Sequence, residues 1–187
     1  MIEAAGDTTH PGRVIDDSFE SSITFDIAHA LKNKILEECP TAKIIINRTL
    51  GETVAPLQNA NFANKLDVDL YLSIHAFAET EPKPRIFIYQ FSYLDSFIAK
   101  DGLSFYPFDK IYLVHEPQTT QWVQLIQKSL SQNQSAQTKK IAKLPFKPLI
   151  GIKASAIGLE LGLKNKTSWR DYIDDLAHSL VLIINQS

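Results

Sequence analysis

Segments whose apolar residues repeat at helical spacing alternate along this chain with short aliphatic runs, and this alternation constrains the fold most strongly. Helical spacing is found in four segments, residues 23–38, 57–65, 119–132 and 168–184. Short aliphatic or β-branched runs, typical of buried strands, occupy residues 43–47, 69–74, 85–91 and 157–161. Strands separated by helices of this size predict an α/β fold in three layers, with a mostly parallel twisted sheet covered by helices on both faces.

The length and composition of the chain indicate one folded domain. It has 187 residues, of which 44% are hydrophobic and 21% are charged, so we expect residues 1–187 to form a single domain with an ordinary core. The formal net charge of −2 argues against a nucleic-acid partner, because nucleic-acid binders carry a basic face. A single cysteine, Cys39, excludes an intramolecular disulfide framework and a zinc cluster of thiolates.

We expect neither a targeting segment nor a membrane span in this sequence. Residues 1–6 read MIEAAG, with an acidic residue where a signal peptide carries positive charge. The longest uninterrupted aliphatic run, residues 180–184, is far shorter than the roughly 20 residues that cross a bilayer. The chain is therefore either a cytosolic protein or a mature fragment whose leader has been removed.

Two chemically active side chains stand near the ends of predicted strands. His75 directly follows the strand at 69–74, and Glu160 lies inside the apolar run 157–163. Sites in α/β sheets form at the carboxyl ends of strands, which favours a functional position for both residues. A buried carboxylate needs a partner, since burying an unpaired charge costs several kcal/mol. Glu160 is therefore either half of a salt bridge or a general acid or base.

The remaining candidates are Glu20 and the other histidines. Glu20 lies just before a predicted helix, where a carboxylate also favours the helix N-terminus electrostatically. His10 lies in a Thr-Thr-His-Pro-Gly loop, as an exposed residue or as a ligand. We interpret His29 and His178, which lie on predicted helices, and His115, which lies in an irregular segment, as structural residues.

Several short motifs follow one another in a fixed order along the chain. Glu20 opens the first helix, and the later motifs are Asn47-Arg48-Thr49, Ala63-Asn64, Ser73-Ile74-His75-Ala76 and the closing segment 159–165. In this order and at these separations, the chain resembles the zinc-dependent N-acetylmuramoyl-L-alanine amidases of the amidase type 3 family. The resemblance extends over nearly the whole chain and implies the phosphorylase/hydrolase-like architecture of their catalytic domains.

The resemblance also implies an activity and a set of site residues. Glu20 and His75 match two zinc ligands of the family, and Glu160 matches its catalytic glutamate. Catalytic zinc usually takes three protein ligands, lowers the pKa of a bound water and polarises the scissile carbonyl. The implied substrate is peptidoglycan or a muropeptide, cleaved at the amide between the lactyl group of muramic acid and the first L-alanine of the stem peptide. The implied location is the cell envelope, and a cytoplasmic location stays open.

The first zinc ligand is where the sequence departs from the family. In the family this ligand is a histidine in a Gly-His-Gly-Gly turn after the first strand, and counting from Ile2 places Gly6 there, followed by Asp7. We assign His10, with Glu20 and His75, as the metal ligands, and keep open that Asp7 substitutes for the histidine or that the third ligand is lost. Carboxylate and imidazole are both acceptable ligands of zinc.

Two other departures bear on activity. Phe77 replaces an asparagine of the family and cannot make its hydrogen bonds, and changes around the ligands commonly weaken metal affinity. The aromatic segment 92–118 is longer than expected and is able to reshape the substrate groove. The sequence therefore supports an active monomeric zinc amidase first. A catalytically inactive relative that binds peptidoglycan or a protein partner is the alternative, and a hydrolase of another amide is a third interpretation.

Overall fold

A parallel trio of strands forms the centre of the sheet. The computed structural model describes residues 1–93, 108–132, 137–138 and 141–186. In it, β4 (Leu70–Ala78) lies between β1 (Ile2–Ala4) and β8 (Ser155–Leu163) and runs parallel to both. Residues 71–74 of β4 and nearly all residues of β8 are buried, so both faces of the central sheet are covered, as expected for parallel strands.

The sheet becomes mixed beyond β8. The next strand, β5 (Arg85–Phe91), pairs antiparallel with β8, and the short strands β6 (Gln137–Thr138) and β7 (Ala142–Leu144) pair parallel with β5. The expected α/β class with a mostly parallel sheet is confirmed, and β5 is the strand that reverses direction. Its bounds coincide with the predicted strand at 85–91.

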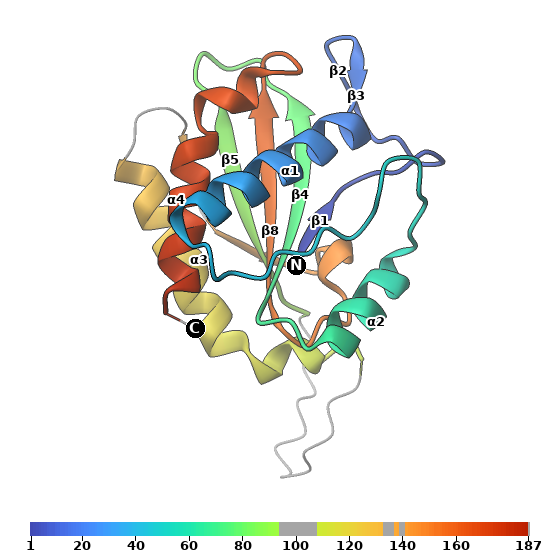
Figure 1. The fold of residues 1–187 in the computed structure, drawn as a ribbon, viewed down its shortest axis with the longest axis vertical. Helices are drawn as coiled ribbons and strands as arrows, with labels where there is room; N and C mark the ends of the chain where they lie inside the picture. The colour runs from blue at the N-terminus through green and yellow to red at the C-terminus, as the bar shows by residue number, and fades with distance from the viewer. Residues whose placement is uncertain (94–107, 133–136, 139–140, 187) are drawn as a thin grey trace.

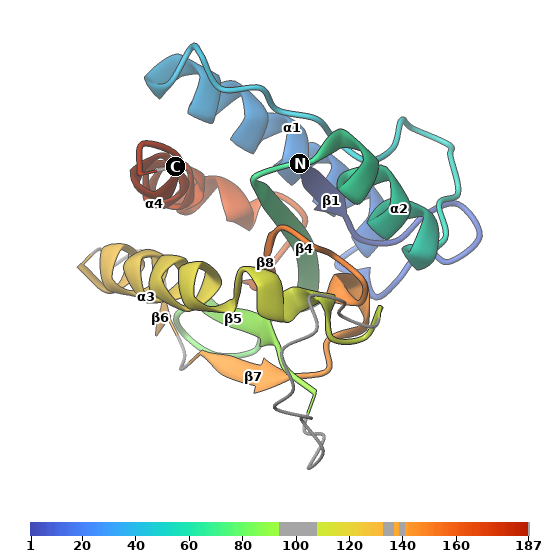
Figure 2. The ribbon, with the colours of Figure 1, turned by 90° about the horizontal axis from the view of Figure 1, so that it is seen from below.

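Helices cover both faces of the sheet (Figures 1 and 2). The helices on the larger core are α1 (Glu20–Glu38), α3 (Glu116–Gln132) and α4 (Ile173–Ile184). The other face carries α2 (Pro56–Leu66) and the 3₁₀ turn η2 (Lys147–Leu149), which pack with Tyr71 and Ala156 in a second cluster. This arrangement gives the three layers that the sequence predicts.

The alternation of side chains along β4 separates the core from the candidate site. Leu72, Ile74 and Ala76 face the larger core, while Tyr71, Ser73 and His75 alternate with them and face the opposite side. The register of β4 with β8 pairs His75 with Glu160. Both predicted site residues therefore belong to one row on one face of the sheet.

A short hairpin connects the end of β1 to α1. It consists of β2 (Val14–Ile15) and β3 (Ser18–Phe19), paired antiparallel, and it stands at the upper end of the molecule in Figure 1. Ile15 is fully buried, whereas Val14 and Phe19 are exposed. One buried side chain thus anchors a hairpin that otherwise faces outward, directly above the N-terminus of α1.

Some predicted elements differ from the observed ones. Residues 43–47 form only an isolated bridge, from Ile2 to Ile46. Both backbone hydrogen bonds between this segment and β1 involve Ile2, so no ladder of paired residues forms. The predicted last helix is divided into the turn η3 (Ser168–Asp171) and α4, and His75 lies within β4 rather than after it. The aromatic segment at 92–118 lies partly outside the described residues. Its described part contains the turn η1 (Ile111–Val114) and the start of α3.

None of the described helices combines the length and the hydropathy needed to cross a membrane.

Candidate functional site

Glu20 connects the N-terminus of α1 to the strand that carries His75. Its Oε1 accepts a hydrogen bond from the backbone N–H of Ala76 at 3.0 Å and lies 3.3 Å from Nδ1 of His75. Burial alone raises the pKa of this carboxyl, but the hydrogen bonds from His75 and from the backbone of Ala76 and Arg13 outweigh it and lower the pKa. Glu20 is therefore held as a carboxylate at the end of β4.

A close approach of the loop before α1 makes this arrangement possible. Gly12 has a φ of +78°, and a Cβ at this position would meet Oε2 of Glu20 at 2.6 Å. Only glycine lets the backbone pass this close to the carboxylate in that conformation. The next residue, Arg13, donates its backbone N–H to the same Oε2 at 3.1 Å.

The side chain of Arg13 extends from this loop across β4 to β8. Its Nη1 donates to Oε1 of Glu160 at 2.5 Å and to the carbonyl of Ala76 at 3.1 Å. The second oxygen of Glu160 accepts a hydrogen bond from the hydroxyl of Tyr89 at 2.7 Å. Both oxygens of Glu160 are therefore engaged. We refer to Arg13, Glu20, His75 and Glu160 as the polar cluster.

The two residues considered for the first metal ligand contact each other in the loop after β1. The imidazole of His10 is 81% exposed and lies 3.5 Å from Oδ1 of Asp7. Asp7 is nearly buried, and its Oδ1 accepts the backbone N–H groups of Thr9 and His10 at 2.8 and 2.6 Å. Desolvation opposes these hydrogen bonds, but their net effect lowers the pKa of Asp7. Asp7 thus shapes the loop, and His10 faces outward from it.

Other motif residues position the site rather than enter it. Arg48 is buried, and its guanidinium donates to the carbonyls of Ala4 at 3.2 Å and Ser21 at 2.7 Å. It thereby joins the end of β1 to the first turn of α1. Asn64 donates to the carbonyl of Gly151 and accepts the N–H of Lys153, both at 2.8 Å. It fixes α2 to the segment that leads into β8.

Half-buried aromatic rings extend from the polar cluster across the same face of the sheet. Phe77 packs against Phe87 with ring centroids 5.8 Å apart, and Tyr89 stacks on Phe146 at 4.8 Å. Phe87 and Tyr89 are also stacked, at 6.5 Å, because they are two residues apart on β5. Phe146 additionally meets His75 edge-on at 5.2 Å. We call Phe77, Phe87, Tyr89 and Phe146 the aromatic row. The phenylalanine at position 77, which departs from the family pattern, is part of it.

The polar cluster does not fit a catalytic zinc ion as it stands. Two ligands of one tetrahedral zinc ion lie about 3.4 Å apart, which agrees with the 3.3 Å between Glu20 and His75. A third ligand is missing, since the part of the chain that the structure describes contains no group of three His, Cys, Asp or Glu residues placed to hold one metal ion. The guanidinium of Arg13 lies instead beside Glu160 and near Glu20.

The sequence analysis did not identify Arg13 or Tyr89. Arg13 directly follows the Thr-Thr-His-Pro-Gly loop that carries His10, and a cation next to this predicted metal loop was the available signal. Tyr89 gave no such signal, because it lies on β5, and only the antiparallel pairing of β5 with β8 brings it to Glu160.

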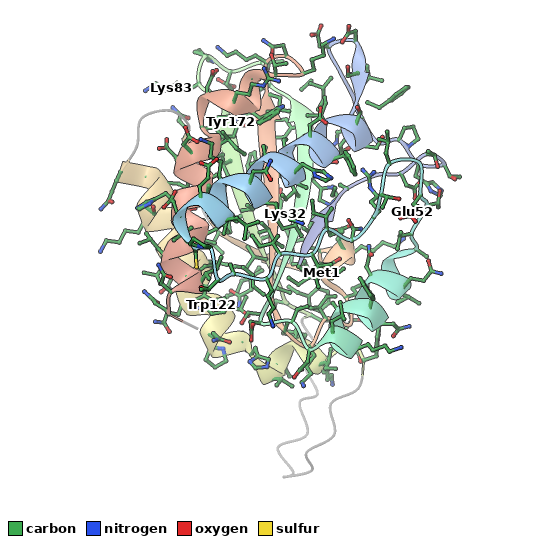
Figure 3. The ribbon with its side chains drawn as sticks, viewed as in Figure 1. Met1, Lys32, Glu52, Lys83, Trp122 and Tyr172 are labelled. Carbon is green, nitrogen blue, oxygen red and sulfur yellow. The ribbon has the colours of Figure 1, made fainter. Side chains whose placement is uncertain are left out.

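A groove of about 540 Å³ lies away from the polar cluster. It is lined mainly by apolar residues, among them Ile2, Leu72 and Ile183, with Lys43 at its polar side. Met1 and Trp122, labelled in Figure 3, also line it and lie well below the β2–β3 hairpin. None of the predicted site residues contributes to this groove.

Comparison with known proteins identifies the family of this chain. The family of N-acetylmuramoyl-L-alanine amidases matches residues 1–178, so the chain belongs to this family of hydrolases. A curated relative, the N-acetylmuramoyl-L-alanine amidase CwlM of Bacillus licheniformis, is 38% identical over 56 residues. That match covers 30% of this chain and 22% of the relative.

Solved amidase structures share the fold over almost the full chain. The catalytic domain of CwlV from Bacillus (Paenibacillus) polymyxa var. colistinus has a TM-score of 0.70 at 16% identity, covering 99% of this chain and 94% of that one. The amidase from Clostridium difficile 630 gives 0.67 at 17% identity, with 99% and 93% covered. Ami1 from Mycobacterium smegmatis gives 0.66 at 13% identity, with 100% and 96% covered. These likenesses bear on the fold alone.

Proposed function

We propose that this chain recognises peptidoglycan or its muropeptide fragments at the junction between muramic acid and the first L-alanine of the stem peptide. The observation that carries this proposal is the convergence of Glu20, His75 and Glu160 at one end of the sheet in a member of the amidase family. The binding surface combines these polar groups with the aromatic row, a mixture typical of sites for small organic ligands. The proposed location is the cell envelope, where this substrate is found.

Each part of this surface has a separate task in the proposal. The half-buried rings of Phe87 and Phe146 supply apolar contact area next to Glu160. The guanidinium of Arg13, whose side chain is 54% exposed, offers further N–H donors to a carbonyl of the ligand. Aromatic side chains bury a large area at a small cost in conformational entropy, so we expect them to carry most of the affinity.

Hydrolysis of the same amide, with the zinc ion of the family, is the second candidate. It is favoured by the 3.3 Å approach of Glu20 to His75 and by the position of Glu160 opposite His75 in the sheet register. In this function Glu160 accepts the proton of the attacking water and passes it to the leaving amine. A water at Glu160 has to compete with Arg13 for Oε1 and with Tyr89 for Oε2. The geometry therefore supports binding more directly than hydrolysis.

The test is an isothermal calorimetric titration of the protein with the defined fragment N-acetylmuramoyl-L-alanyl-D-isoglutamine. We expect binding by the unmodified protein without added metal, and a loss of about tenfold in affinity for Phe87→Ala. Phe62→Ala is the matched control, because Phe62 is an exposed phenylalanine on α2 outside the aromatic row. Absence of binding, or equal losses in both variants, contradicts the proposed site.

Mass spectrometry of the same mixtures separates binding from hydrolysis. Release of N-acetylmuramic acid in the presence of zinc, abolished by Glu160→Gln, would establish the hydrolytic candidate in place of simple binding. An intact fragment after prolonged incubation, together with a measurable affinity, supports recognition without cleavage.

A further inference from the structure

Arg13 places a positive charge beside one carboxylate of the polar cluster, Glu160, and within electrostatic range of a second, Glu20. Its Nη1 donates to Glu160, and the nearby charge of Glu20 adds to the attraction. Burial opposes the charged form of Arg13, but the hydrogen bond and charge of Glu160 outweigh it, so the pKa of the guanidinium lies above its ordinary value. The guanidinium of Arg13 therefore supplies a positive charge that offsets the negative charges of Glu160 and Glu20.

The main chain fixes Arg13 in this position. The backbone N–H of Arg13 donates to Oε2 of Glu20 at 3.1 Å, and the N–H of Glu20 donates to the carbonyl of Arg13 at 2.8 Å. The hairpin that begins at the next residue is anchored by the fully buried Ile15. The backbone of Arg13 is therefore already ordered, and only side-chain entropy opposes the pairing of its guanidinium.

The direction of the side chain is equally specific. Nη1 is shared between Glu160 on β8 and the carbonyl of Ala76 on β4, so the guanidinium spans the two strands that carry Glu160 and His75. The backbone N–H of the same Ala76 donates to Glu20. Arg13 thereby joins the strands that present the family's ligand and catalytic residues.

We propose that the guanidinium of Arg13 takes the place of the metal ion in this chain, and that the polar cluster binds zinc only after Arg13 is removed. A zinc ion held by Glu20 and His75 would lie near the fixed positive charge of Arg13, and this repulsion opposes its binding. Without the arginine, Glu20 and His75 provide two ligands of the types that zinc accepts, 3.3 Å apart, and the unpaired carboxylate of Glu160 adds negative charge near them. The inference deepens the proposed function, because it makes recognition of the muramoyl peptide independent of metal.

The experiment is a zinc titration of the purified chain against a chromogenic chelator, combined with thermal unfolding. We expect no stoichiometric zinc binding by the unmodified protein and a melting temperature that neither zinc nor EDTA changes. Arg13→Ala should bind one zinc ion at least about tenfold more tightly, and zinc should raise its melting temperature by about 5 °C. Arg13→Lys keeps the charge and should behave like the unmodified protein.

Two further variants test where the gained zinc binds. Arg13→Ala combined with His75→Ala should lose the gained affinity, since a ligand is removed. Arg170→Ala, which removes an exposed arginine from the η3 turn, should leave zinc binding unchanged. Tight stoichiometric zinc binding by the unmodified protein overturns the proposal by itself, so the result does not depend on whether Arg13→Ala folds.

The failure of this inference is distinguishable from the failure of the proposed function. A protein that binds both zinc and the muramoyl dipeptide retains the proposed function, and Arg13 then does not replace the metal ion. A protein that binds neither retains the role of Arg13 and loses the proposed ligand.

Discussion

Two arginine–glutamate pairs lie on the same face of the sheet and are held in different ways. Glu79 accepts two hydrogen bonds from Arg85, at 2.8 and 2.9 Å, and its oxygens also accept the backbone N–H groups of Thr80, Glu81 and Arg85. Its side chain is fully buried. Glu160 instead shares one side-chain nitrogen of the half-exposed Arg13 with a backbone carbonyl.

The difference shows which pair serves the fold and which lies in the site. Glu79 directly follows β4 and Arg85 begins β5, so the first pair closes a single turn with a complete set of hydrogen bonds. Arg13 and Glu160 are 147 residues apart, and their contact is partly open to solvent. A buried, fully bonded pair costs much to break, while an exposed single contact costs little. Substitutions in each pair test this contrast.

The largest effect is expected at the closed pair. Glu79→Gln leaves the Arg85 charge without its partner and weakens several backbone hydrogen bonds, so we expect a loss of about 2 kcal/mol in the free energy of unfolding. Urea unfolding followed by circular dichroism measures it. Glu81→Gln, at an exposed neighbouring position, should be almost neutral. Equal stability of the two variants contradicts the structural role of Glu79.

The same pair predicts a dependence of stability on pH. Burial raises the pKa of Glu79, but Arg85 and the backbone N–H groups lower it to about 2, below the ordinary value of 4.5. The charged form is thus favoured by folding, and its contribution is complete above about pH 4.5 and disappears as the pH falls toward 2. The stability difference between the unmodified protein and Glu79→Gln should shrink over that interval. A difference that stays constant between pH 5 and about pH 2 refutes this assignment.

A smaller effect is expected for the tyrosine that holds Glu160. The phenol of Tyr89 is partly buried, and desolvation together with the hydrogen bond to Glu160 raises its pKa. Tyr89→Phe removes that hydrogen bond and keeps the ring stacked on Phe146, so the unfolding free energy should fall by about 1 kcal/mol. The exposed Tyr93 provides the control, and Tyr93→Phe should be neutral. A neutral Tyr89→Phe would mean that this bond does not hold Glu160.

The smallest stability effect is expected at Arg13. The exposed contact to Glu160 should contribute less than about 1 kcal/mol, so Arg13→Ala should remain folded without metal. Urea unfolding in EDTA measures the change, with Arg170→Ala as a comparison. A loss of unfolding free energy as large as that expected for Glu79→Gln would mean that both arginine–glutamate pairs stabilise the fold equally, which contradicts the difference proposed between them.

Much of the layout was predictable from local patterns. Apolar spacing located α1, α2 and α3 to within a few residues, and the run 85–91 gave the bounds of β5. The run at 43–47 was predicted as a strand but forms only one bridge, since residue composition does not reveal how many partners an edge segment finds. The three residues that the family resemblance named, Glu20, His75 and Glu160, do lie together, although their roles remain proposals.

The first metal ligand shows where local reasoning stopped. His10 was chosen for its chemistry and its place in the loop, but its side chain points to solvent beside Asp7. The contact between Arg13 and Glu160 was not predicted, because the sequence does not show that the side chain of Arg13 crosses β4 to reach β8. Spacing along the chain identifies which residues share an element, and it does not give the direction of a long side chain.

The sequence by itself determined the α/β class, the family and the identity of the residues that carry charge near the strand ends. Those conclusions follow from periodicity and from ordered motifs, which are properties of neighbouring residues. Only the tertiary structure decided that Arg13 rather than His10 lies beside Glu160, and that Tyr89 completes the contacts of that carboxylate. Both contacts join segments that are at least 71 residues apart, so they depend on strand order and register, which no local pattern specifies.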